Sequence, residues 1–422
     1  MYRREFLGLA GSSAAIALLS GCARISRGTA QKGPNVVFLI GDDTGYNDFG
    51  YRTAGKACRT PHIDTLSENG TRFTNAYATC PLCSPSRAAM MTGRYQNRFG
   101  YEYNPGHRSW VADSFGLPTG EITIGELLKQ AGYVTGYVGK WHLGFRPEQH
   151  PLNRGFDEFF GFLGGGQDYY DRKRDLHDPS LRGHKPVEEK EYLTHAFTRE
   201  AVDFIERHAG RRDFFLVVSY NAVHAPWQAP QEDVDAFPEI SPGNRRTMAG
   251  MVKALDDGVG RILTALRERG VLDNTFIVFV GDNGGAENMD NAPLRGFKGS
   301  VFEGGIRVPF IMQWRGHIPA GRMYDGLTSA LDISPTIAAA AGVPMPAERE
   351  IDGVNLLSHV TGATPDPPHP VLYWRHGYRG EAIRKGNWKL IRVEQESGTD
   401  RMVFDLNNDI GEKEDLYPGR DR

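Results

Sequence analysis

The chain has 422 residues and a formal net charge of −3, a length that suits two or three domains and a charge that offers no basic field for nucleic acid. Hydrophobic residues make up 40% and charged residues 24%, which is ordinary for a soluble globular protein. No internal repeat is present, which excludes a solenoid.

The first 22 residues have the features of an export signal. Arg3 and Arg4 precede a short apolar run that ends in small residues. The start resembles a twin-arginine signal, and Leu19–Cys22 resembles a bacterial lipobox, whose cysteine is lipidated; an ordinary cleaved signal is the alternative. Residues 23–33 are predicted to form a polar tether. We expect an exported bacterial protein, periplasmic or a lipoprotein of the outer membrane or cell surface, which meets the membrane only through a lipid anchor.

Four apolar, β-rich runs predict strands that are buried on both faces of a mostly parallel sheet. They are Asn35–Ile40, Tyr133–Val138, Phe214–Tyr220 and Thr275–Val280. Helical patterns lie between them, at Ile122–Ala131, Leu193–His208 and Thr247–Gly270. The sequence therefore predicts an α/β fold, with a large sheet flanked by helices.

Each predicted strand is followed by side chains that can bind a metal or move a proton. In chain order these are Asp42 and Asp43, then Lys140 and His142, then His224, and finally Asp282 and Asn283. Ligands of open α/β sheets gather beyond the carboxyl ends of the strands. One such end is explained by the preference of Asp and Asn for turns, but four together indicate an active site.

The residue types at these strand ends suggest both a metal and a substrate. Asp42, Asp43, Asp282 and Asn283 offer only oxygen ligands, which suit Ca²⁺ and, less well, Mg²⁺. Other candidates supply positive charge or transfer protons: Arg87, Lys140, Lys298, His142 and His224. Several cations around a divalent metal indicate an anionic substrate of the phosphate or sulfate type.

The stretch CPLCSPSRAAMMTGR, from Cys80 to Arg94, predicts a loop that enters a helix. Ser84 suits the N-cap and Pro85 the first turn. Cys83 is then expected at a helix N-terminus, where free N–H groups favour negative charge, with Arg87 one turn further on. This is a suitable place for a nucleophile that attacks an anionic ester.

Three other interpretations of the cysteines remain open at this point. Cys80 and Cys83 could form a redox pair, although no small thioredoxin-like unit is evident. Cys58, His62, Cys80 and Cys83 could bind zinc, and Cys83 could act as a plain thiolate nucleophile. These alternatives do not account for the oxygen-rich strand ends. Cys80 could also pair with Cys58, but no sequence pattern fixes that geometry.

The stretch CSPSR, continuing to TGR at Thr92–Arg94, resembles the signature of the sulfatase family, in which the cysteine is converted to formylglycine. The resemblance extends through PNVVFLIGDDTGYNDFG, GYVGKWHLG, NAVHAPW, GDNGG and RGFKGSVFEGGIRVPFI, and so covers nearly the whole mature chain. It implies an alkaline phosphatase-like fold and hydrolysis of sulfate monoesters. It also implies that a formylglycine-generating maturation enzyme acts on this protein.

The resemblance also implies a role for each candidate residue. Asp42, Asp43, Asp282 and Asn283 are the implied Ca²⁺ ligands, joined by formylglycine at position 83. Arg87 and Lys140 would steady the hydrated aldehyde and the sulfate, and His142 would be the general base. His224 and Lys298 would face the sulfate and the leaving-group oxygen. One hydroxyl of the hydrate would attack sulfur and displace the alcohol, which leaves the sulfate on the enzyme. Loss of a proton from the other hydroxyl would then re-form the aldehyde and expel sulfate.

Domain boundaries and substrate are predicted less directly. We expect a catalytic domain at 34–364 and, after a proline-rich break, a small antiparallel α+β subdomain at 365–422. Loops at Gly100–Trp110 and Gly161–Asp178 suggest recognition of a sulfated polysaccharide or oligosaccharide, and the residues that could stack on sugars are Tyr103, His107, Tyr169, Tyr170 and Trp227. The alternatives are a phosphonate or phosphate ester hydrolase of the same superfamily and a non-catalytic carbohydrate-binding relative.

Overall fold

The computed structural model describes residues 33–418, apart from 54–57, 107–113, 172–177, 378 and 396–397. The predicted export signal and the tether up to Lys32 lie outside the described residues. From Gly33 onward the chain forms one compact unit. No helix in the described part of the chain is both long and apolar enough to cross a membrane.

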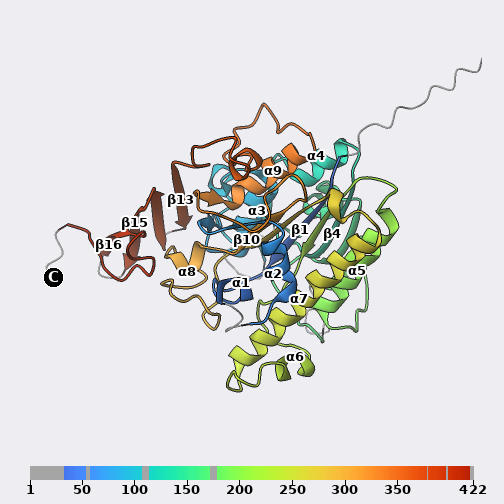
Figure 1. The fold of residues 1–422 in the computed structure, drawn as a ribbon, viewed down its shortest axis with the longest axis horizontal. Coiled ribbons are helices and arrows are strands. Elements are labelled where there is room, and N and C mark those ends of the chain that lie inside the picture. Colours follow the sequence, from blue (N-terminus) through green and yellow to red (C-terminus); the bar gives the residue numbers. More distant parts are fainter. Residues whose placement is uncertain are drawn as a thin grey trace, which may run out of the picture. The chain divides into compact units, whose positions relative to one another are not determined.

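A ten-stranded sheet lies at the centre of the described chain (Figure 1). In spatial order its strands are β11 (Arg322–Tyr324), β2 (Thr71–Phe73), β10 (Phe310–Gln313), β9 (Thr275–Gly281), β1 (Asn35–Gly41), β8 (Phe214–Ser219), β4 (Val134–Lys140), β5 (Glu158–Phe162), β6 (Leu181–Arg182) and β7 (Lys185–Pro186). The strands from β9 to β5 run parallel, whereas β10 and β6 pair antiparallel with their neighbours. The prediction of a mostly parallel central sheet is confirmed.

Helices cover both faces of this sheet (Figure 1). Alternate residues of β1 show why the run is apolar throughout: Val37 and Leu39 pack into one core, and Val36 and Phe38 pack into another. The first core contains α2 (Pro61–Glu68), α5 (Leu193–His208) and α7 (Asn244–Glu268). The second contains α3 (Cys83–Thr92), α4 (Ile124–Gln130) and α9 (Ile333–Ala340). The shorter helices are α1 (Gly50–Thr53), α6 (Gln231–Asp235), α8 (Glu303–Ile306) and α10 (Leu357–Val360).

All four predicted strands and all three predicted helices exist. The strand bounds differ by one residue at most at each end, except that β4 ends two residues later than predicted, and α5 matches its prediction at both ends. The prediction of Ser84 as an N-cap is wrong, because α3 already begins at Cys83 and its N-cap is Leu82. Ser84 therefore lies in the first helical turn, and its hydroxyl donates instead to the carbonyl oxygen of His142.

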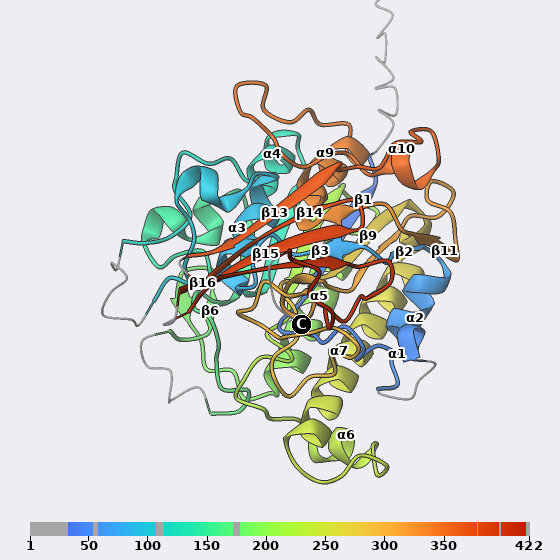
Figure 2. The same ribbon diagram turned by 90° about the vertical axis from the view of Figure 1, so that its left-hand side faces the viewer.

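A second, antiparallel sheet follows the strands of the main sheet in the sequence. Its strands are β13 (Val371–His376), β14 (Gly380–Lys385), β15 (Trp388–Gln395) and β16 (Gly398–Asp405), and they lie side by side in Figure 2. One face packs on the main body, where Trp374, Ile391 and Phe404 meet Tyr77 and Ile306. The chain described after β16, as far as Pro418, contains no helix. A further short pair joins β3 (Ala76–Tyr77) to β12 (Thr328–Ser329).

Candidate active site

The two neighbouring strands β1 and β9 deliver the acidic residues to one place. Gly41 and Gly281 are register partners at the ends of these strands, so Asp42 and Asp282 leave the sheet side by side. The amide N–H of Asp43 donates to Asp282 Oδ1 at 3.2 Å, and Asn283 Nδ2 donates to Asp43 Oδ1 at 2.8 Å. The four predicted oxygen ligands therefore form one buried group.

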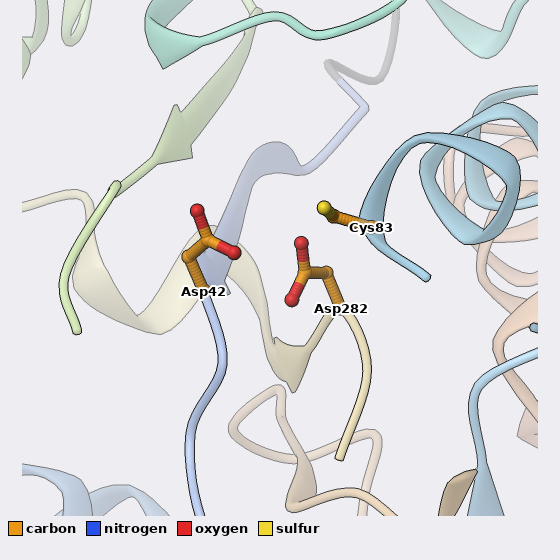
Figure 3. Close-up of side chains that lie close together, drawn as sticks. All are labelled: Asp42, Cys83 and Asp282. Carbon is orange, nitrogen blue, oxygen red and sulfur yellow. The ribbon is translucent and has the colours of Figure 1, made fainter. Parts of the chain in front are cut away.

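Cys83 meets this acidic group from the opposite direction, at the first residue of α3 (Figure 3). Its Sγ and one carboxylate oxygen each of Asp42 and Asp282 all lie within 4.8 Å of one another. Asn104, which sequence reasoning did not assign to the site, holds the start of this helix: its Oδ1 accepts from Ser84 N at 3.2 Å, and its Nδ2 lies 3.8 Å from Cys83 Sγ. Asn104 lies in the loop predicted to recognise the substrate, and no sequence pattern distinguishes it from its neighbours there.

Three cations are paired with the three carboxylates. Arg87 Nε donates to Asp282 Oδ2 at 2.9 Å, and Lys140 Nζ donates to Asp42 Oδ2 at 2.5 Å. Lys298 Nζ lies 2.7 Å from Asp43 Oδ1. Arg87 and Lys140 are fully buried, so these charges interact across a region that excludes water.

Arg87 is further fixed by β8 and β4. Its Nη1 donates to Ser219 Oγ at 2.5 Å and to the carbonyl oxygen of Lys140 at 3.1 Å. Ser219 is another residue that sequence reasoning missed, although it is a polar residue at the carboxyl end of an apolar strand, which is the available signal. The guanidinium therefore has little freedom to turn away from the site.

The two predicted histidines are close to the lysines and are kept neutral. Burial and the nearby ammonium of Lys140 hold the pKa of His142 well below its usual value. Burial and Lys298 lower the pKa of His224 to about 3. Nδ1 of His224 lies 2.7 Å from the carbonyl oxygen of Ala225, which assigns its hydrogen to Nδ1 and leaves Nε2 free to titrate.

A glycine run brings a loop against both imidazoles. A Cβ at Gly165 would lie 2.7 Å from the ring of His142, and one at Gly166 would lie 3.0 Å from Nδ1 of His224. Any side chain at Gly165 would displace the His142 ring. The run GGGQD after β5 thus has a packing function next to the site.

The acidic group fits a hard divalent cation. Burial and the neighbouring Asp282 raise the pKa of Asp42 to about 8, which marks a carboxylate with too little positive charge around it. Asp42 Oδ1 and Asn283 Oδ1 are buried and have no hydrogen-bond partner in the described part of the chain. Oxygen atoms left without partners beside an unbalanced carboxylate are what a Ca²⁺ ion would satisfy.

The structure contradicts the disulfide and zinc interpretations of the cysteines, and it leaves the plain thiolate at Cys83 as an alternative nucleophile. Cys58, Cys80 and Cys83 are free thiols, so neither a Cys80–Cys83 redox bridge nor a Cys58–Cys80 disulfide is formed. The groups of metal-ligating side chains found in the described residues do not combine Cys58, His62 and Cys80, which overturns the zinc site. Burial raises the pKa of both Cys58 and Cys80 to about 12, as expected of inert core thiols.

The prediction that Tyr169 stacks on a sugar ring is wrong. Tyr169 is fully buried, and its hydroxyl donates to the carbonyl oxygens of Asn221 at 2.6 Å and His224 at 3.0 Å, so it packs the loop instead. Tyr170 is 45% exposed, and Tyr103 and Trp227 are partly exposed. His107 lies outside the described residues.

Comparison with known proteins identifies the family. The Sulfatase family model matches residues 34–343, and the model for the N-sulphoglucosamine sulphohydrolase C-terminal region matches residues 297–421. The chain is 38% identical over 378 residues to human (Homo sapiens) N-acetylgalactosamine-6-sulfatase, covering 84% of this chain and 70% of that protein.

Solved structures agree. The crystal structure of Ps i-CgsB in complex with k-i-k-neocarrahexaose has a TM-score of 0.85 and 40% identity, and the match covers 91% of this chain and 89% of that one. The PsFucS1 sulfatase from Pseudoalteromonas sp. has a TM-score of 0.75 and 27% identity, with 91% of this chain and 86% of that one covered. The chain belongs to the sulfatase family, has the alkaline phosphatase-like fold, and is an enzyme that hydrolyses sulfate esters.

Proposed function

We propose that this sulfatase removes sulfate from sugars of a sulfated polysaccharide or oligosaccharide built on galactose, using formylglycine at position 83 and a Ca²⁺ ion. The observation that carries the reaction is the meeting of Cys83, Asp42 and Asp282 at the N-terminus of α3. The sugar rests on the names of two similar proteins, one an N-acetylgalactosamine-6-sulfatase and one solved with a carrageenan-type hexasaccharide.

At position 83 a hydrated aldehyde can complete a reaction cycle that a thiol cannot. A hydrated aldehyde supplies one hydroxyl as the nucleophile and a second whose deprotonation lets sulfate leave. Burial of this position within the acidic group and next to Arg87 shields it from bulk water. Asn104 holds it at the helix start through the contacts described above.

Asp42, Asp43, Asp282 and Asn283 would hold the calcium ion. A bound Ca²⁺ would polarise a sulfate oxygen and would offset the burial and the Asp282 charge that raise the pKa of Asp42. Arg87 and Lys140 are already fixed by the carboxylates, so they contribute positive charge to the sulfate without a further loss of side-chain freedom.

The two histidines have different places in the reaction. His142 is neutral, and its Nδ1 is buried without a partner in the described part of the chain, so it can hold a proton released at position 83. His224 is also neutral, and because its hydrogen is on Nδ1, it presents an unprotonated Nε2 beside Asp43 and Lys298. These two residues face the leaving-group oxygen, where the ammonium of Lys298 supplies positive charge and the donor hydrogen.

The remaining parts of the proposal concern maturation and location. A formylglycine-generating enzyme would act on Cys83, and export through a twin-arginine signal would follow in the folded state. Lipidation at Cys22 would then place the enzyme at the periplasmic or outer surface, where sulfated glycans are encountered. The catalytic unit is proposed to span 34–364 and the small C-terminal subdomain 365–422.

The function is tested by two measurements on protein from its native host. Mass spectrometry of the peptide that contains Cys83 should show the aldehyde or its hydrate. Ion chromatography should then detect sulfate released from sulfated galactans and galactosamine glycans, and little from sulfated glucosamine glycans. A preference for an aryl phosphate or phosphonate over an aryl sulfate would favour the alternative hydrolase, and an unmodified thiol in active enzyme would refute the nucleophile.

A further inference from the structure

The outward face of the C-terminal sheet carries its side chains in ordered rows. The strand register places Arg375, Glu381, Arg392 and Arg401 opposite one another across β13, β14, β15 and β16. The neighbouring row is Tyr373, Ile383, Leu390 and Val403. Tyr373 is 51% exposed and Leu390 is 39% exposed, so this second row is an apolar strip open to solvent.

One cross-strand pair in the charged row is unfavourable as it stands. Arg392 and Arg401 are direct partners on β15 and β16, and like charges in that arrangement repel. Arg392 is paired with two carboxylates, Glu381 at 3.0 Å and Glu394, whereas Arg401 has no ion-pair partner among the residues that the structure describes. An anion beside Arg401 would supply the partner that this guanidinium lacks and would relieve the remaining repulsion.

A groove of about 350 Å³ lies over these rows. Tyr373, Ile383 and Leu390 form its apolar floor, and Arg375, Arg392 and Arg401 stand along its side. An aromatic and aliphatic floor suits the apolar face of a sugar ring, and the arginines suit sulfate groups on the same chain. With strands about 4.8 Å apart, the arginine row extends roughly 14 Å, which is the scale of an oligosaccharide.

The row begins next to the catalytic site. The carbonyl oxygen of Arg375 lies 3.8 Å from the thiol of Cys80, three residues before Cys83. Nδ1 of His376 lies 2.9 Å from the carbonyl oxygen of Gly299, the residue after Lys298. The guanidinium of Arg375 pairs with Glu102, in the loop that also carries Asn104. The strand β13 at one end of the groove is therefore joined to segments that carry site residues, and the other strands of the sheet extend from it (Figure 2).

We propose that this groove binds sulfated sugars of the same glycan chain that lie beyond the ester being cleaved, with Arg392 and Arg401 sharing one sulfate group. The proposal rests on the proposed function, because it assumes a sulfated glycan as substrate. It makes the C-terminal sheet a polymer-binding surface, so that long sulfated chains are better substrates than monosaccharides.

The test compares a sulfated galactan polymer with a sulfated galactose monosaccharide, by sulfate release from the matured enzyme. In Arg401→Ala the ratio of kcat/KM for the polymer to that for the monosaccharide should fall about five-fold, and in Arg392→Ala/Arg401→Ala about twenty-fold. Arg315→Ala is the matched control, since it removes an exposed arginine that pairs with Asp273 at the amino end of β9, whereas the site lies beyond the carboxyl end of this strand. A ratio that stays at the wild-type value in both groove variants overturns the proposal.

A binding measurement separates this proposal from the proposed function. Cys83→Ala protein is titrated at low salt with the polymer and with its chemically desulfated form. If the Arg401→Ala substitution in this background weakens binding of the sulfated polymer, the groove is supported. If the wild type releases no sulfate from any glycan, the proposed function is refuted, but the binding result still supports the groove. Equal binding of both polymers refutes the groove. A wild-type dimer in sedimentation that Arg401→Ala dissociates would also refute it, because the face would then bind a second copy.

Discussion

Two buried charge clusters of this protein look alike in composition but differ in how complete they are. The site cluster joins Asp42, Asp43 and Asp282 to three cations. The interface cluster joins Glu303 of α8 and Glu412 to Lys389 of β15, where Lys389 Nζ lies 2.9 Å from Glu303 Oε1 and 2.8 Å from Glu412 Oε1. It ties the C-terminal sheet to the main body.

Glu303 is satisfied entirely by the protein. Its second oxygen accepts from the Tyr77 hydroxyl at 2.7 Å and from Arg307 at 3.0 Å. In the site cluster, by contrast, Asp42 Oδ1 and Asn283 Oδ1 have no such partner in the described chain. In the interface cluster Glu412 Oε1 also lacks a hydrogen bond in the described chain, but it lies 2.8 Å from the ammonium of Lys389. Unsatisfied buried polar atoms are costly, so the site cluster is expected to gain more from a bound ligand than the interface cluster.

The largest expected effect is confined to the site cluster. Cys83→Ser should lower multiple turnover by about 10⁴-fold or more, because a serine sulfate ester has no second hydroxyl through which to expel sulfate. Steady-state sulfate release measures the loss, and intact-protein mass spectrometry should show one sulfate retained per chain. The melting temperature should stay close to that of the wild type. Full multiple turnover by this variant would contradict the mechanism.

The second prediction is a loss of stability without a loss of activity, at the interface cluster. Lys389→Met removes the ammonium shared by two buried carboxylates and should lower the free energy of unfolding by about 3–5 kcal/mol. Urea unfolding measures the loss, and kcat/KM per folded molecule should remain within about two-fold of the wild type. Lys385→Met, at an exposed position of the neighbouring strand, is the control and should change stability little. A large loss of activity without a loss of stability would show that the two clusters are not separate in function.

The difference between the clusters also explains what could be predicted from the sequence. The site cluster is built at the ends of apolar strands, so the runs before Asp42, Lys140, His224 and Asp282 predicted both the sheet and the place where these residues meet. The interface cluster was not predicted, because Lys389 in the alternating run NWKLIRV has the pattern of any strand, and its partners are distant in sequence. Ser84 and Tyr169 were misassigned because their partners, the carbonyl oxygens of His142 and His224, come from other segments.

The third prediction tests whether the site cluster is completed by a bound Ca²⁺ ion, by removing that ion. Saturating Ca²⁺, at about 100 times its dissociation constant, should stabilise the wild type by about 3 kcal/mol and raise its melting temperature, because the ion binds only the folded site. Chelation should reverse the shift and remove activity, and added Ca²⁺ should restore both. Asp42→Asn/Asp282→Asn should lose the calcium-dependent shift, and Lys389→Met should keep it. A wild-type melting temperature that ignores calcium would refute the metal site.

The smallest expected effect concerns Glu412, the carboxyl of the interface cluster that ionises less readily. Burial raises the pKa of Glu412 to about 7, whereas Glu303 has its pKa held at about 2, since Lys389 and Arg307 outweigh its burial. Because the pKa of Glu412 is raised by folding, its contribution to stability is present below the unfolded pKa of about 4.5 and is lost as the pH rises to 7. The lowered pKa of Glu303 changes the stability only between about pH 2 and pH 4.5. The wild type should therefore lose on the order of 2 kcal/mol between pH 4.5 and 7 through Glu412. Glu412→Gln keeps an oxygen that accepts from the Glu303 amide, but this side chain cannot ionise. The free energy of unfolding of this variant in urea should therefore change less between pH 4.5 and 7. An identical dependence on pH in both proteins would show that Lys389 balances both carboxylates.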